Sequence, residues 1–154
     1  MRILDAGKQY VRYDKGPGRD ITDIEIEADI IELRFTCGMG NRDREVITPQ
    51  SAAWDVVVDL SVSIRARSGP AIQGGTPQNI PFFVALINRF GQVVEKQSFS
   101  AEISFDNNTG PSSQTLEENI VLRIPVRSLE EASSYETIVS FQLTEDQLDQ
   151  TNKN

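Results

Sequence analysis

Acidic side chains are the residues of this chain with the clearest capacity for chemistry. Asp and Glu number 23 against 15 Lys and Arg, and the chain holds no histidine and one cysteine. Without histidine, a serine or cysteine nucleophile lacks its usual base. Carboxylate pairs can serve a glycosidase, but no spacing here singles out a pair, because the separation that decides the mechanism is three-dimensional. We therefore expect no catalytic residues, no bound cofactor and no enzymatic activity.

Four carboxylates alternate along one predicted strand, at Asp23, Glu25, Glu27 and Asp29. Neighbours in this row lie about 6.6 Å apart, from the rise of a strand per residue. Calcium needs roughly six to eight oxygen ligands, so adjacent members of the row cannot bind it without a neighbouring loop. We expect a solvated outer face, partly neutralised by the arginines at 65 and 67 on a paired strand.

Four residues are candidate contacts with a partner. Phe90 lies in a predicted turn, where a large apolar side chain is hard to bury. Arg42 and Arg44 lie in a long predicted loop, Gly38 to Gln50. Trp54 begins a strand, where we expect it in the core or at its rim; an exposed Trp54 beside polar groups would favour carbohydrate binding.

Seven stretches of the chain alternate apolar and polar residues with period two, as half-buried strands do. Gly, Pro, Asn and Ser clusters separate them, and none keeps the spacing of a long helix. This pattern predicts an all-β protein, an immunoglobulin-like antiparallel β-sandwich of about seven strands. We expect one domain over residues 1–143 and a flexible acidic tail over 144–154.

Within the first long stretch, the apolar residues change from even-numbered to odd-numbered positions. Ile24 to Ile30 carry the apolar face at even positions, whereas Ile31 to Cys37 carry it at odd positions. An extra residue must enter near Ile30 and Ile31, which predicts a β-bulge or a strand that crosses between sheets. Cys37 is then expected to be a small buried strand residue.

Two connections have specific signatures. Asn88 to Gly91 predict a tight hairpin turn, with Gly91 at a positive φ. Ser128 and Glu131 have the spacing of a capping box, which predicts one short helical turn before the last strand. Tyr135 follows this turn, as in the tyrosine corner of immunoglobulin-like domains, so we expect its hydroxyl to bind upstream backbone.

Charge and hydropathy limit the partners. A formal net charge of -8 and scattered basic residues disfavour nucleic acid and anionic membranes. No run approaches the roughly 18 apolar residues of a membrane span, and the amino terminus has no recognisable secretory signal.

Four segments carry a resemblance to a known group of proteins: Gly18 to Ile24, Val58 to Ile64, Pro81 to Leu86, and Tyr135-Glu136 with Ser140 to Thr144. Together they resemble small alphaproteobacterial envelope lipoproteins of uncharacterised function. The resemblance implies a periplasm-facing location and no known activity. It also implies a lipid-modified cysteine near the mature start, which this sequence does not contain.

These observations favour a non-enzymatic binding or structural module of the bacterial cell envelope. It would act through protein–protein contacts, by surface complementarity or by strand addition at an open sheet edge. The alternative is a β-sandwich that binds carbohydrate or calcium through the acidic row and Trp54. Contact with a membrane is expected only through a lipid anchor, and the oligomeric state stays open.

Overall fold

The structure, a computed structural model, describes residues 2–3, 9–14, 21–41, 54–72, 74–75, 77–105, 112–145 and 147. Strands dominate it. The elements are β1 (Arg2–Ile3), β2 (Tyr10–Asp14), η1 (Ile21–Asp23), β3 (Ile24–Asn41), β4 (Trp54–Ser68), β5 (Gln78–Ile87), β6 (Val93–Ile103), β7 (Ser113–Val126), α1 (Leu129–Ser134) and β8 (Glu136–Phe141).

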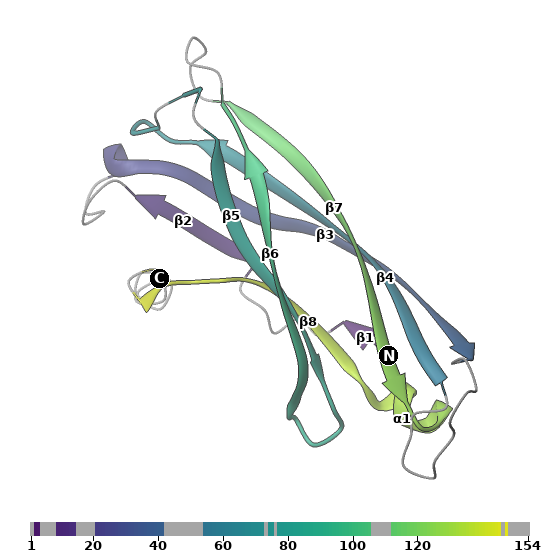
Figure 1. The fold of residues 1–154 in the computed structure, drawn as a ribbon. Helices are drawn as coiled ribbons and strands as arrows, with labels where there is room; N and C mark the ends of the chain where they lie inside the picture. Colours follow the sequence, from purple (N-terminus) through teal and green to yellow (C-terminus); the bar gives the residue numbers. More distant parts are fainter. Residues whose placement is uncertain are drawn as a thin grey trace.

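The strands form two four-stranded sheets, in the orders β2-β3-β4-β7 and β1-β8-β5-β6 (Figure 1). Every pairing is antiparallel except that of the two-residue β1 with β8. The predicted immunoglobulin-like antiparallel β-sandwich is confirmed as an architecture. The strand order differs from that of a constant immunoglobulin domain, because β7 here joins the sheet of β2, β3 and β4.

Side chains from both sheets form one core. Its largest fully buried members come from both sheets: Phe82, Phe141, Ile26, Leu60, Ile64 and Ile80. Phe82 stacks on Phe99 of β6, with ring centroids 5.4 Å apart. The even-numbered residues of β4 from Val56 to Ala66 face this core, because side chains alternate across a strand.

The predicted irregularity in the first long stretch is confirmed as a β-bulge. Ile30 pairs with Ile64 and Glu32 with Ser63, so Ile31 has no opposite residue on β4. The stretch remains a single strand, β3, because the ladder with β4 resumes directly after the bulge. Ile31 was expected on the apolar face, but it is 46% exposed because it is the extra residue of the bulge.

The far end of β3 corrects two further predictions. Gly38 to Asn41 were assigned to a loop, but they pair with Val57 to Trp54 and extend the strand. Cys37 was expected to be buried and is exposed. The remainder of the predicted loop, residues 42–50, lies outside the described residues.

Two short strands escaped prediction, and β6 begins earlier than expected. β2 pairs with β3, and β1 pairs with β8. β6 starts at Val93, whereas the alternation of apolar residues in this stretch predicts a strand only from Phe99. Seven strands of five or more residues are present in the described part of the chain, as expected, although β2 takes the place of one predicted strand.

The start of the predicted tail contacts the sandwich. The Thr144 backbone N–H donates to Gln147 Oε1 at 2.9 Å, and Gln147 Nε2 donates to the carbonyl of Arg12 in β2 at 3.2 Å. Position 146 and residues 148–154 of the tail lie outside the described residues.

Candidate functional site

The turn between β5 and β6 is held by Asn88. Its Oδ1 accepts hydrogen bonds from the backbone N–H of Phe90 and of Gln92, each at 3.0 Å. Gly91 has a φ of 77°, the left-handed conformation that favours glycine, as predicted. These bonds fix the turn so that Phe90 occupies its tip.

Apolar side chains gather at this hairpin end. Phe90 is 72% exposed, Val93 59% and Val94 45%. The guanidinium carbon of Arg89 lies 4.8 Å from the centroid of the Phe90 ring, a cation–π arrangement. The prediction that Phe90 is hard to bury is confirmed.

The corner formed by α1 lies beside the hairpin end. Ser128 caps α1, since its Oγ accepts from the Glu131 N–H at 3.1 Å. Glu131 Oε2 in turn accepts from the Arg127 N–H at 2.8 Å. The carboxylate thus reaches back over the cap as in the predicted capping box, but it binds the residue before Ser128 rather than Ser128 itself. The charged and polar groups of this corner are thus held by their own hydrogen bonds.

The Tyr135 hydroxyl corrects the prediction of a backbone bond. It donates to Glu131 Oε1 at 2.9 Å, because the capping box already brings that carboxylate to the corner. The Arg127 N–H and the Tyr135 hydroxyl both stabilise the charged carboxylate, which lowers the pKa of Glu131. Burial and the same carboxylate raise the pKa of Tyr135.

A groove of about 530 Å³ separates the hairpin end from the α1 corner. Phe90 and Val94 form part of one wall, and Arg127 and Tyr135 part of the other. The lining combines apolar side chains with charged groups that are held by hydrogen bonds. We take this groove, together with Phe90, Val93 and Val94, as the candidate site and call it the hairpin groove.

The structure describes no side chain for the other predicted contact residues. Trp54 begins β4, where it pairs with Asn41 and Val126, and its side chain lies outside the described residues. Arg42 and Arg44 lie outside the described residues altogether. The sequence did not reveal that the α1 corner forms one wall of the hairpin groove. The capping-box spacing predicts where the helix starts, but not that the helix lies beside the hairpin turn.

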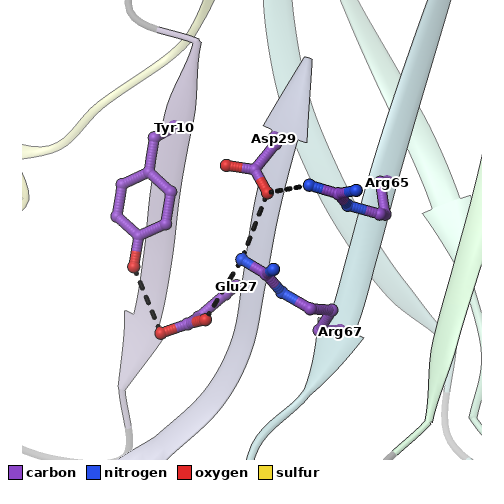
Figure 2. Close-up of polar contacts among 5 residues, drawn as sticks. All are labelled: Tyr10, Glu27, Asp29, Arg65 and Arg67. Carbon is purple, nitrogen blue, oxygen red and sulfur yellow. Dashed lines mark hydrogen bonds and ion pairs between the residues drawn. The ribbon is translucent and has the colours of Figure 1, made fainter. Parts of the chain in front are cut away.

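Two members of the acidic row, Glu27 and Asp29, are neutralised across the ladder, in line with the expected partial neutralisation (Figure 2). Asp23, which was expected on the same strand, lies in η1 instead. Arg67 Nη2 lies 3.1 Å from Asp29 Oδ2 and 3.4 Å from Glu27 Oε2, and Arg65 Nη2 lies 3.4 Å from Asp29 Oδ2. The Tyr10 hydroxyl donates to Glu27 Oε1 at 3.2 Å. Burial, followed by the charge of Glu27, raises the pKa of Tyr10 to about 12. Within the described ranges, no group of three or more His, Cys, Asp or Glu side chains is arranged to hold a metal ion.

A second groove, of about 840 Å³, lies along the sheet of β3, β4 and β7. Its polar lining includes Asp59, Ser61, Glu117 and Asn119. The Ser61 hydroxyl donates to Glu117 Oε1 at 3.0 Å, so this carboxylate is already partly engaged.

No family model, curated protein or solved structure matches this chain. Among the described residues, no helix has the length and apolar character needed to cross a membrane. The site must therefore be judged from its own contacts.

Proposed function

We propose that this chain is a non-enzymatic binding or structural module that acts through protein–protein contacts at the hairpin groove. The observation that carries the proposal is that the exposed Phe90 and Val94 line a groove, with the exposed Val93 next to Val94 in the chain. Aromatic side chains that enter a partner's pocket are common anchors of protein interfaces.

The groove also defines what the partner must offer. An apolar side chain of the partner would pack on Phe90 and Val94, and an acceptor would meet Arg89, which is an exposed residue of the groove lining. Asn88 holds the turn in advance of binding, so little conformational entropy is lost there.

The bacterial envelope is the proposed setting of this contact. The support is the resemblance of four sequence segments to envelope lipoproteins. The alternative of a calcium or carbohydrate module has less support, because Arg65, Arg67 and Tyr10 already occupy oxygens of Glu27 and Asp29.

Capture from a bacterial envelope extract tests this function with a matched pair of variants. Phe90→Ser removes the anchor, and Ile21→Ser removes a side chain of similar exposure, 73%, in η1. We expect the wild type and Ile21→Ser to retain the same protein and Phe90→Ser to lose it. In titrations of that purified protein, Phe90→Ser should weaken binding about tenfold or more. Equal retention by all three chains would contradict the proposal.

A further inference from the structure

β7 forms one edge of its sheet, where it pairs only with β4. Its pairing with β4 is continuous from Trp54 and Val126 to Arg67 and Ser113, without a register shift. Along an edge strand, every second residue directs its backbone N–H and C=O away from the sheet. Among the described residues, no backbone hydrogen bond joins this outer side of β7 to another segment. The edge is therefore long, regular and open.

The neighbours of β7 leave its middle uncovered. β6 approaches it only near its start, where Gln114 Nε2 donates to the Ser104 carbonyl at 2.7 Å, and the two strands then diverge (Figure 1). Pro125 lies near the other end, as a proline can in an edge strand, because one side of the strand needs no N–H. The open stretch runs between these two points.

The side chains of this stretch carry an unused charge pattern. Glu117, Asn119, Val121 and Arg123 are exposed, with Val121 at 59%. Glu117 receives the Ser61 hydroxyl on one oxygen only. Arg123 makes no ion pair with any other residue that the structure describes. An available carboxylate and an available guanidinium thus lie six positions apart on one edge strand.

We propose that this edge pairs with β7 of a second copy of the chain, antiparallel about a two-fold axis at Ile120. In this register Glu117 lies opposite Arg123 of the second copy, and Asn119 lies opposite Val121 of the second copy. The two-fold axis generates each of these pairs twice in the dimer. An isologous interface of this kind matches each patch to itself.

The choice of axis follows from charge. In an antiparallel pair, two opposed residues either both direct their backbone N–H and C=O toward the partner strand or both direct them away. When two copies of one strand pair, an odd-numbered residue must therefore lie opposite an odd-numbered one, and an even-numbered residue opposite an even-numbered one. Among such registers, only the one centred on Ile120 sets Glu117 against Arg123. Opposite charges that face each other across a strand pair stabilise it, whereas like charges destabilise it.

The pairing joins the two β2-β3-β4-β7 sheets into one continuous sheet and covers Val121. It uses the β7 edge rather than the hairpin groove, so it stands independently of the proposed function.

Sedimentation of the full chain at low salt, from micromolar to millimolar concentration, tests this interface. The wild type should form a reversible dimer. Arg123→Glu and Glu117→Arg should each raise the dissociation constant about tenfold or more, because two favourable pairs become two like-charge pairs. Lys96→Glu makes the same charge change at an exposed lysine of β6, outside both β7 and the hairpin groove, and it should leave the dissociation constant unchanged.

An equal mixture of Arg123→Glu and Glu117→Arg chains provides the decisive measurement. Each variant repels itself, because positions 117 and 123 are both acidic in the first and both basic in the second. In the mixture the acidic positions of one chain face the basic positions of the other, so a heterodimer of near wild-type affinity should form. This recovery also shows that both variants are folded. A wild type that stays monomeric at millimolar concentration, a single reversal without effect, or a mixture that does not associate would each overturn the proposal.

Discussion

The ladder centred on β4 and the hairpin end of β5 and β6 are both built from antiparallel pairs, but they differ in how far their side chains are buried. β4 has a neighbouring strand on each side, and its core-facing residues from Val56 to Ala66 are at most 2% exposed. β6 has one neighbour, and every side chain from Val93 to Ser98 is exposed. Burial is therefore set by what the second sheet and the adjacent strands cover, not by the local apolar content.

The largest expected effect lies at the centre of the ladder. Ile64 is fully buried, so Ile64→Ala should lower the free energy of unfolding by about 2–5 kcal/mol, through lost transfer energy and a residual cavity. Urea unfolding measures this loss. Val94→Ala at the hairpin end is the control, and a comparable loss there would show that the two regions do not differ as described.

A smaller effect is expected at the α1 corner, where Tyr135 can be compared with Tyr13 of β2. Tyr135→Phe removes the hydrogen bond to Glu131 and should cost about 1 kcal/mol. The Tyr13 hydroxyl is buried without a partner among the described residues, and burial raises its pKa to about 12. Tyr13→Phe should thus leave stability unchanged or raise it. Thermal unfolding of both variants checks the contrast; equal losses would contradict it.

The corner also predicts a dependence on pH. The folded chain lowers the pKa of Glu131, so its contribution to stability is complete above the usual carboxyl pKa and is lost as pH falls through the lowered value. Glu131→Gln should flatten the stability profile in that acidic range. Unfolding measured from neutral to acidic pH tests this, and a wild-type profile retained by the variant would refute the assignment.

The ion pairs of Figure 2 should contribute less. Arg67 is about two-fifths exposed, so Arg67→Gln should lower the free energy of unfolding by at most about 1 kcal/mol. The loss should shrink in high salt, because ions screen exposed pairs. Urea titrations at two salt concentrations give both values, and a loss independent of salt would indicate packing rather than charge.

The smallest effect belongs to the hairpin tip. Phe90→Ser removes a side chain with little intramolecular contact beyond Arg89, so stability should change by no more than about 0.5 kcal/mol. Thermal unfolding checks this directly. A larger loss would mean that Phe90 stabilises the fold itself.

Much of the sandwich could be predicted because period-two alternation directly reports a strand with one buried face. The change of parity at Ile30 and Ile31 likewise located the bulge. β2 escaped because its five residues, Tyr10 to Asp14, are too few to establish a period. The first half of β6 escaped because a strand exposed on both faces has no reason to alternate. Phe90 was found from its turn, but the opposite wall of the groove depends on the long-range placement of α1.

The bulge has a consequence for the shape of the sheet. Ile31 has no partner on β4, and without it Ile30 and Glu32 would be consecutive residues opposite Ile64 and Ser63, as in a regular ladder. Deletion of Ile31 would leave all the residue pairs between β3 and β4 unchanged. Because a bulge bends its strand and adds local twist, curvature in this sheet is encoded separately from pairing, in a single residue that natural variation can insert or delete.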